Sequence, residues 1–468
     1  MRFEDLREKY KEFIYEDFIY SIEDNTLIIE YIFIISDLET FNPKWYIPLN
    51  GKEIDINDTN IRSLIFSLGL VELISYWKIT CSPNVIIKPS YLDNNQIEWW
   101  KKLYFNGLGE FFYTNNINTN IEEFMNIKVS GTNKFEIKKV EYLNGILIPI
   151  GGGKDSAVTI DLLKDFYDNN DCYVINERDA TKNTAKLANY QDKTINVKRI
   201  LDKKMIELSG YAKDKTSSVK GSVDEKDLKS KGYLSGHTPF STIVAFSSLL
   251  TSYIYGKKYI ALSNESSANE PTVANTTINH QYSKSFEFEK DFSLYVNNYL
   301  NIGINYFSIL RPVSEFQITS YFSKLTRFHD IFRSCNNGSK LDIWCNNCPK
   351  CLFVFIMMSA FLDIEYISKL FGDNILENKN LLPSLYQLIG STLEKPFECV
   401  GSKDEVNIAI CTSIQKEKEI PYLYKEYMKT EFYDEYKNKK NIYLKYYDDN
   451  NLVPEEFLKI VKDKFDLG

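Results

Sequence analysis

The sequence predicts an α/β protein built around a parallel sheet, with further domains on either side. Strand-like and helical segments alternate between residues 145 and 262, three consecutive glycines join one strand to the next helix, and four cysteines cluster near residue 345. At 468 residues the chain is too long for one typical hydrophobic core. We expect an α+β domain over residues 1–140, a parallel-sheet domain over 141–330, and a helical region with a metal site over 331–468.

The first domain is expected to mix strands and helices. Residues 25–35 are mostly β-branched or aromatic, which predicts a strand. Residues 61–74 carry apolar side chains at helical spacing, which predicts an amphipathic helix. The residue pattern of this domain alone indicates no particular ligand.

The alternation that predicts the parallel sheet begins at residue 145. Expected strands are residues 145–150, 172–176 and 258–262, and expected helices are residues 156–167 and 242–255. This order favours a parallel sheet with helices on both faces and with ligands at the carboxyl ends of the strands. Residues 213–232 are polar and lack a clear period, which is typical of a surface loop or of a lid over a nucleotide.

The glycine turn after the first of these strands predicts a phosphate site. The turn consists of Gly151, Gly152, Gly153, Lys154, Asp155 and Ser156. Glycines allow a sharp bend, and the free N–H groups at a helix start attract anions. Lys154 can neutralise phosphate charge and Ser156 can donate a hydrogen bond, whereas Asp155 would repel a triphosphate unless a divalent cation, expected to be magnesium, bridges them. The alternative is an ordinary turn capped by Asp155 or Ser156.

The turn differs from the two commonest phosphate-binding motifs. A Walker loop requires glycine, and later serine or threonine, where this chain has Ile148 and Asp155. The dinucleotide-binding fingerprint requires a third glycine or alanine where Ser156 stands. The turn is therefore a third kind of phosphate-binding loop.

Four of the eight cysteines lie close together in the C-terminal third. They are Cys335, Cys345, Cys348 and Cys351, spaced C-x9-C-x2-C-x2-C. In a chain without a secretory signal this spacing favours a metal site over disulfides. Four thiolates suit tetrahedral zinc and leave no position for water, so the zinc would be structural; an iron–sulfur cluster is the alternative. We expect the metal to fix the loop after Ser334 to a helix that begins near Cys351.

Charge and hydropathy exclude several kinds of partner. The net charge of −8 argues against a nucleic-acid surface, which normally carries a basic stripe. The longest strongly apolar stretch, residues 352–362, is too short to span a bilayer and predicts a buried helix. The first ten residues are charged and lack the apolar centre of a secretory signal. We expect a cytoplasmic protein that acts on a small molecule; the sequence leaves its oligomeric state open.

Two known families share parts of this pattern. The glycine turn resembles the SGGxDS loop of the PP-loop ATP pyrophosphatases, with Gly151 in place of the first serine. Those enzymes split ATP into AMP and pyrophosphate to adenylate a substrate oxygen. The cysteine spacing further downstream is similar to that of the 7-cyano-7-deazaguanine synthases, which are shorter and lack this N-terminal third.

A longer resemblance, over about residues 65–410, is to the UDP-N-acetylmuramoyl-L-alanyl-L-glutamate epimerases. It is carried by short blocks at residues 75–78, 107–111, 148–156, 236–239, 263–270, 279–285, 310–312, 344–351 and 395–401. The resemblance implies a PP-loop fold that converts the terminal L-glutamate of UDP-MurNAc-L-Ala-L-Glu to D-glutamate. It also implies that ATP, with magnesium, is hydrolysed to AMP and pyrophosphate at the glycine turn. The N-terminal third is then expected to hold the UDP-sugar.

The blocks also supply candidate catalytic residues. They are Lys154, Asp155, Glu265, Glu270, His280, Lys284 and Cys399. Glu265 and Glu270 follow the strand at 258–262, so one can act as base while the other contacts magnesium or ribose; structural roles for both are the alternative. His280 and Cys399 are candidate acids or bases, each with an ordinary structural role as its alternative.

Lys284, Gly236 and His237 are also candidates for binding. Lys284 can bind a carboxylate or phosphate, or can be a solvated surface charge. Gly236 and His237 are expected to contact phosphate through the turn and the imidazole ring. Two other functions compete with epimerisation: a deazapurine or nucleobase-modifying synthase that consumes ammonia, and a nucleotide-sensing protein without turnover, which pyrophosphate release on adding substrate would exclude.

Overall fold

The computed structural model describes residues 2–140, 142–209, 232–274, 276 and 278–467. The chain forms two compact units, each assembled from separate stretches of sequence. Unit 1 comprises residues 1–143, 196–256 and 295–304, and unit 2 comprises residues 144–195, 257–294 and 305–468. The expected domain ranges 1–140, 141–330 and 331–468 stay predictions.

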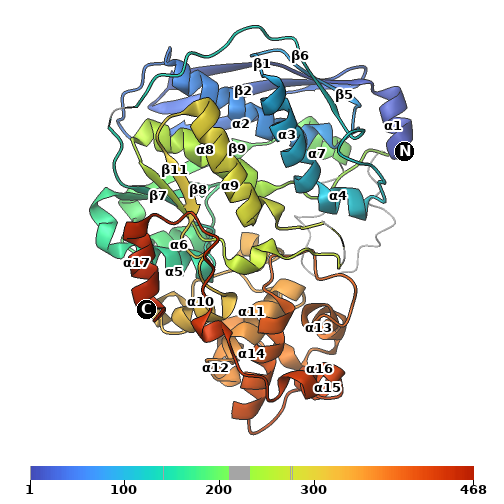
Figure 1. Cartoon of the computed structure of the whole chain (residues 1–468), viewed down its shortest axis with the longest axis vertical. Coiled ribbons are helices and arrows are strands. Elements are labelled where there is room, and N and C mark those ends of the chain that lie inside the picture. Colours follow the sequence, from blue (N-terminus) through green and yellow to red (C-terminus); the bar gives the residue numbers. More distant parts are fainter. Residues whose placement is uncertain (1, 141, 210–231, 275, 277, 468) are drawn as a thin grey trace. The chain divides into compact units, whose positions relative to one another are not determined.

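Unit 1 contains a mixed sheet (Figure 1). Its strands are β1 (Glu12–Glu23), β2 (Thr26–Ile35), β3 (Glu39–Phe41), β4 (Lys44–Pro48), β5 (Asn84–Ile87), β6 (Asn126–Val129) and β9 (Thr194–Ile200). The order β9–β4–β2–β1 is antiparallel, β5 and β6 follow β1 in parallel, and β3 pairs with β2. Alternate residues of β2 from Leu27 to Ile35 are buried, so one face of the strand packs into the core.

The helices of unit 1 include one that is long and almost wholly buried. They are α1 (Phe3–Lys9), α2 (Thr59–Trp77), α3 (Asn94–Gly107), α4 (Gly109–Thr114), α7 (Lys203–Ser209) and α8 (Phe240–Tyr255). Helix α2 packs on β1 and β2 and beside α8. Its buried Glu72 accepts hydrogen bonds from Arg199, at 2.7 Å, and from the Trp45 indole, at 3.2 Å. Because a buried carboxylate is costly without partners, these bonds fix α2 to β4 and β9.

Unit 2 contains a four-stranded parallel sheet. Its strands, in the order β11–β10–β7–β8, are β11 (Asn305–Ser308), β10 (Tyr259–Leu262), β7 (Ile146–Pro149) and β8 (Asn170–Ile175). The helix α5 (Lys154–Leu162) follows β7, and α6 (Asp179–Leu187) follows β8. The glycine turn follows the carboxyl end of β7 and Glu265 follows that of β10, which is the edge where such sheets bind ligands.

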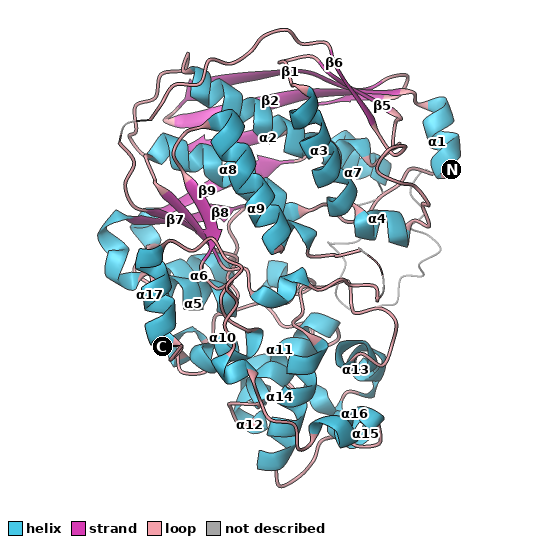
Figure 2. Ribbon diagram, viewed as in Figure 1, coloured by secondary structure: helices cyan, strands magenta, loops and turns pink. Residues whose placement is uncertain are grey.

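The rest of unit 2 is mainly helical (Figure 2). The helices are α9 (Phe286–Tyr295), α10 (Glu315–Phe322), α11 (Pro349–Ser359), α12 (Ile364–Phe371), α13 (Leu382–Ile389), α14 (Lys403–Lys416), α15 (Tyr422–Tyr427), α16 (Glu431–Tyr436) and α17 (Glu455–Lys464). Helix α11 is buried from Cys351 to Ser359 and packs against α10, α12, α13 and α14. This confirms the expected buried helix in residues 352–362.

Most predicted elements are present, and several unpredicted ones accompany them. The strands expected at residues 25–35 and 145–150 and the helices expected at 61–74 and 242–255 are confirmed as β2, β7, α2 and α8. The capping box of Ser314 and Gln317 starts α10. The helix expected at residues 156–167 ends early, because the Asn170 side chain caps the Leu163 carbonyl at 3.1 Å.

Other predictions concern the polar stretches of the chain and its capacity to cross a membrane. The polar stretch after residue 176 contains α6, β9 and α7, which the sequence analysis did not predict. The lid or loop expected at residues 213–232 falls, except for Gly232, outside the described residues. Among the residues that are described, no helix is both long and apolar enough to cross a bilayer.

Candidate active site

The glycine turn of unit 2 has a backbone that larger residues would disrupt. Gly152 has a φ of +78°, and a Cβ there would lie 2.8 Å from the backbone carbon of Ala180. A Cβ on Gly153 would lie 2.8 Å from the Ser334 hydroxyl oxygen. The Arg333 N–H donates to the Gly152 carbonyl at 2.9 Å. The turn is therefore held by its neighbours in a shape that requires glycine.

Lys154, in the second half of the turn, pairs with Asp155 and with a second carboxylate that sequence reasoning did not single out. The buried Lys154 ammonium makes ion pairs with Asp155 and with Glu315, the first residue of α10. Burial raises the pKa of Glu315 to about 8, although Lys154 opposes that shift. Asp155 is itself buried enough to raise its pKa, but Lys154 and Lys350 more than compensate and lower it. The Lys154 ammonium thus keeps Asp155 charged most readily, whereas Glu315 holds its proton up to a higher pH than an ordinary carboxyl group.

A thiol and an ammonium group face each other in the same unit. The Lys284 Nζ lies 3.1 Å from the Cys399 Sγ and donates to it. Burial tends to raise the pKa of the Cys399 thiol, but Lys284, the His280 ring and Lys350 lower it to about 6. Lys284 is also among the charges that lower the pKa of Asp155, so this pair lies near the glycine turn. The structure thus brings His280 and Lys284 to Cys399, and Lys284 is close enough to Asp155 for its charge to act on that carboxyl group.

This thiol should react with alkylating agents at unusually low pH. Because its pKa is lowered to about 6, the reactive thiolate is present above pH 6 and is lost below it. The rate at which iodoacetamide modifies Cys399, measured by peptide mass spectrometry, should rise with a midpoint near pH 6. An ordinary thiol would show a midpoint near pH 8.5. Cys411, whose pKa burial raises, should give no such low-pH midpoint and serves as the internal control.

A buried arginine positions two of the candidate residues. Arg311 is fully buried and donates to the backbone carbonyls of Glu265 and Lys284. It also makes an ion pair with Glu289 at 3.0 Å, which neutralises its charge. Glu265 is buried, and its carboxylate accepts from the Ser267 hydroxyl at 3.2 Å. Arg311 therefore fixes the backbone from which Glu265 and Lys284 extend.

Glu270 has a different environment from Glu265. Its carboxylate makes an ion pair with Lys395 at 3.0 Å, and 42% of its side chain is exposed. The backbone N–H of Lys395 also donates to the Thr272 carbonyl at 2.8 Å. These contacts join the segment after β10 to the segment that leads to Cys399, which is a structural role for Glu270.

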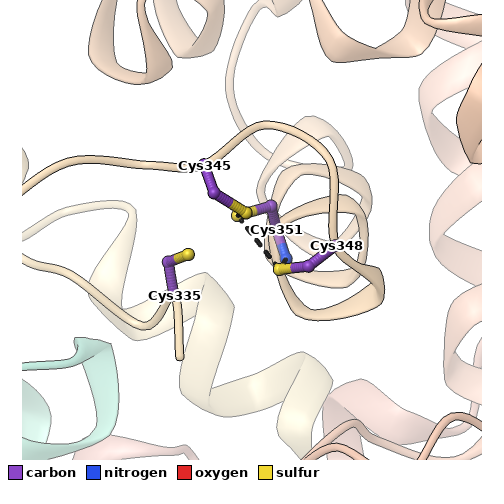
Figure 3. A group of neighbouring side chains, drawn as sticks. All are labelled: Cys335, Cys345, Cys348 and Cys351. Atoms are coloured by element: carbon purple, nitrogen blue, oxygen red, sulfur yellow. Dashed lines mark hydrogen bonds between the residues drawn. The ribbon is translucent and has the colours of Figure 1, made fainter. Parts of the chain in front are cut away.

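The four clustered cysteines converge on one point in unit 2 (Figure 3). Cys335 comes from one loop and faces Cys345, Cys348 and Cys351, which come from a second loop and the start of α11. Their sulfur atoms all lie within 4.8 Å of one another. A tetrahedral zinc site requires sulfurs about 3.8 Å apart. The arrangement fits one closed site for a metal ion.

The sulfurs also receive the backbone hydrogen bonds expected around thiolates. The Gly338 N–H donates to Cys335 at 3.0 Å, and the Cys351 N–H donates to Cys348 at 3.4 Å. Such donors stabilise negative charge on sulfur. The chemistry of the donors therefore fits a metal, with zinc favoured.

Replacing Cys348 should remove both metal and stability. Because closed four-thiolate sites contribute folding energy directly, Cys348→Ser should lose about one bound zinc per chain and unfold at a lower temperature. Elemental analysis and thermal melting would measure the two effects. Cys172→Ser, a buried cysteine outside the cluster, should keep its zinc. A metal-free wild-type protein with full stability would contradict the structural-zinc interpretation, and a brown chromophore would favour iron–sulfur.

Gly236 and His237 lie in unit 1, where three of the sequence blocks meet. The buried Lys78 ammonium donates to the carbonyls of Gly236 and His237, the latter at 2.8 Å, and to the Thr238 hydroxyl. The His237 Nδ1 lies 3.1 Å from a carboxylate oxygen of Glu110. Gly236 has a φ of +146°, a conformation that residues with side chains rarely adopt. Lys78 therefore fixes this turn; its predicted contact with phosphate stays a prediction.

Sequence reasoning missed four residues with central positions: Lys78, Arg311, Glu315 and Lys350. Lys78 and Arg311 belong to blocks that carried the family resemblance, but their bonds to backbone carbonyls have no sequence signal. Lys350 lies between two of the clustered cysteines, and its ammonium donates to the Cys399 carbonyl. Glu315 follows the capping residue of α10, where an acidic residue ordinarily serves the helix alone.

A tight glycine turn at the carboxyl end of a parallel strand, with a paired thiol and ammonium in the same unit, defines an α/β protein with an enzyme-like site. Comparison with known families agrees with this class. The model of the MurL N-terminal domain matches residues 4–214 and 216–309, and that of the MurL C-terminal domain matches residues 331–439. The chain belongs to the MurL family.

Curated relatives resemble the chain over most of its length. A protein of Xanthomonas oryzae pv. oryzae, named UDP-N-acetyl-alpha-D-muramoyl-L-alanyl-L-glutamate epimerase, is 27% identical over 76% of this chain and 75% of its own. Proteins of the same name from a Micromonospora species and from Salinispora tropica are each 28% identical over 73% of this chain. The matches cover 73% and 71% of those two relatives.

Proposed function

We propose that the protein is an ATP-dependent epimerase that converts the terminal L-glutamate of UDP-MurNAc-L-Ala-L-Glu to D-glutamate for peptidoglycan synthesis in the cytoplasm. The names of the relatives support this substrate. One observation carries the proposal: Gly401, two residues after Cys399, lies against Glu315, the partner of Lys154, which puts the Cys399–Lys284 pair close to the glycine turn. An enzyme that activates a carboxyl group and then moves the neighbouring proton requires both kinds of group in one place.

The need for activation follows from the acidity of the α-proton. Removing that proton beside a free carboxylate would place a second negative charge next to the first. Transfer of AMP from ATP to the carboxylate removes the first charge, releases pyrophosphate and makes the carbonyl electron-withdrawing. A base can then remove the proton, an acid can return it on the other face, and water finally releases the free acid and AMP.

The glycine turn provides the groups expected to bind ATP. The backbone at Gly152 and Gly153 leaves no room for side chains, and the turn opens helix α5, whose first N–H groups attract phosphate. Lys154 supplies a buried positive charge next to them. Asp155 is the residue expected to hold magnesium, which would neutralise the charge on the phosphates.

Cys399 is the group best suited to move the α-proton. A thiolate with a pKa of about 6 is charged at neutral pH and becomes a weak acid once it holds a proton. Lys284 stabilises its charged form, and Lys350 fixes its backbone carbonyl. We assign Cys399 to one face of the α-carbon. We assign Glu265 to the other, because its charge is close enough to raise the pKa of both Lys284 and Glu315.

A buried amide near Cys399 is suited to bind the peptide part of the substrate. The Gln281 Nε2 donates to the carbonyl of Val400 at 3.2 Å. Its Oε1 is buried and has no hydrogen-bond partner among the described residues. A buried acceptor without a donor costs about 1–3 kcal/mol. We assign this oxygen to the N–H of the substrate peptide bond.

The four-cysteine site helps to hold Cys399 in position, through Lys350. Zinc held by Cys335, Cys345, Cys348 and Cys351 would fix the loop and the first turn of α11. Lys350 lies between two of these ligands and contacts the Cys399 carbonyl. The zinc would therefore act on catalysis only by holding Lys350 in place.

The direct test is a reaction with purified protein, ATP, magnesium and UDP-MurNAc-L-Ala-L-Glu. Chiral analysis of the glutamate should show the D form, with AMP and pyrophosphate produced only when substrate is present. Without ATP the glutamate should stay in the L form. Pyrophosphate release with no inversion, or release that depends on added ammonia, would contradict the proposal and favour a nucleobase-modifying synthase.

A further inference from the structure

Unit 1 contains a cavity far along the sequence from the glycine turn. Its volume is about 170 Å³, and it is lined by α2, by the turn before α3, and by residues 134–137 and 295–300. A cavity of about 150 Å³ is known to hold one benzene molecule. The cavity in unit 1 therefore accommodates one six-membered ring, and any group attached to that ring must extend through the opening.

The walls of this cavity are aromatic. Phe66 and Phe135 lie with ring centroids 5.8 Å apart, and Tyr295 and Tyr299 lie 5.0 Å apart. Aromatic rings of this kind stack favourably on planar bases. A flat unsaturated ring is therefore a better occupant than a sugar.

Polar groups in the cavity can form hydrogen bonds with one edge of a bound ring. One Asp93 oxygen accepts the Gln96 N–H at 2.8 Å, which caps α3 and fixes the carboxylate at the cavity wall. Burial, and then the Asp93 charge, raise the pKa of Tyr299, so its phenol stays a hydrogen-bond donor. Gln96 and Trp100 donate to the Tyr295 oxygen at 3.3 Å and 3.1 Å, so this phenol has no further capacity as an acceptor. A carboxylate acceptor beside a phenol donor complements a ring N–H next to a carbonyl.

The opening of the cavity carries a positive charge. Lys134 is exposed, and its ammonium lies 4.3 Å from the centroid of the Tyr91 ring. In a chain with a net charge of −8, a lysine at this position favours an anionic group outside the ring. A pyrimidine nucleotide matches all three features: it has a planar ring, an edge with a donor next to an acceptor, and an anionic phosphate group outside the ring.

We infer that this cavity binds the uracil base of a uridine diphosphate group, with Asp93 accepting the N3–H of uracil and Tyr299 donating to a neighbouring carbonyl. The inference rests on the proposed function, because the proposed substrate carries UDP. Cytosine presents an unprotonated N3 to the same carboxylate. Uridine nucleotides should therefore be preferred over cytidine nucleotides.

The test is calorimetric titration of UDP and CDP into the full chain. UDP should bind at least tenfold more tightly than CDP. Asp93→Asn should weaken UDP binding at least tenfold and remove most of the preference, while asparagine still caps α3. Tyr299→Phe, which leaves that cap untouched, should also weaken UDP binding.

Asp58→Asn is the matched control, because Asp58 caps α2 in the same way but does not line the cavity. It should bind UDP like the wild type. No UDP binding by the wild type, equal binding of CDP, or unchanged UDP binding by both cavity variants would overturn the inference. These results do not depend on turnover, so a wild type that binds UDP but fails to invert glutamate would contradict the proposed function alone.

Discussion

Asp155→Asn should slow the formation of AMP and pyrophosphate more than about a hundredfold and leave the fold intact. A hundredfold loss corresponds to about 2.7 kcal/mol of transition-state stabilisation. The asparagine has the same size but lacks the charge that would hold a divalent cation beside the triphosphate. The Asp155 side chain is 31% exposed, and Glu315 remains to pair with the buried Lys154 ammonium, so the substitution should not unfold the protein. Substrate-dependent pyrophosphate release is the measurement.

A matched variant separates the role of Asp155 from a general loss of charge. Asp165→Asn changes an exposed aspartate of the same unit and should keep the wild-type rate. Thermal melting should show similar stability for both variants. If Asp155→Asn keeps full activity with magnesium, Asp155 does not hold the cation and the interpretation of the turn is wrong.

Cys399→Ser should abolish inversion but keep the adenylation step. Serine is close in size and can still accept a hydrogen bond from Lys284, but its hydroxyl is far too weak an acid to form an anion near neutral pH. We expect exchange of the α-proton with solvent to fall at least a hundredfold, about 2.7 kcal/mol. Pyrophosphate release on adding substrate should continue. Comparing the two rates in one reaction mixture separates proton transfer from nucleotide binding.

The control for this variant is Cys411→Ser. Cys411 is a buried thiol of the same unit that lies 3.6 Å from the Tyr427 hydroxyl and far along the chain from the glycine turn. It should keep both exchange and pyrophosphate release. If Cys399→Ser loses both reactions together, Cys399 serves the binding of ATP or substrate; if it loses neither, the thiol has no part in catalysis.

The elements that sequence reasoning found are those with a strong local pattern. The strand β7 and the buried helix α11 are continuous apolar runs, and the glycine turn lies directly after the first of them. The strand β9 was missed although Ile195 and Val197 are buried in alternation with polar residues, because the surrounding sequence is polar. Local pattern predicts an element but not its partner: β9 pairs with β4, about 150 residues earlier.

The candidate site was only partly predictable for the same reason. Asp155 belongs to a recognisable glycine motif, and the four cysteines have the spacing of a metal site. The family resemblance suggested Cys399 and Lys284. Their mutual distance of 3.1 Å is a property of the fold, because 115 residues separate them in the chain. The bonds of Arg311 to the carbonyls of Glu265 and Lys284 have no sequence signal, because any buried arginine could make them.

The central claim is that ATP activates the carboxyl group so that the α-proton can be exchanged. The measurement that tests it most directly is mass spectrometry of the glutamate released after reaction in deuterated water. With ATP, magnesium and UDP-MurNAc-L-Ala-L-Glu, the D-glutamate should carry deuterium at its α-carbon, and omitting ATP should stop both inversion and deuterium uptake. Deuterium uptake without ATP, or D-glutamate that retains the original hydrogen in every molecule, would contradict the account.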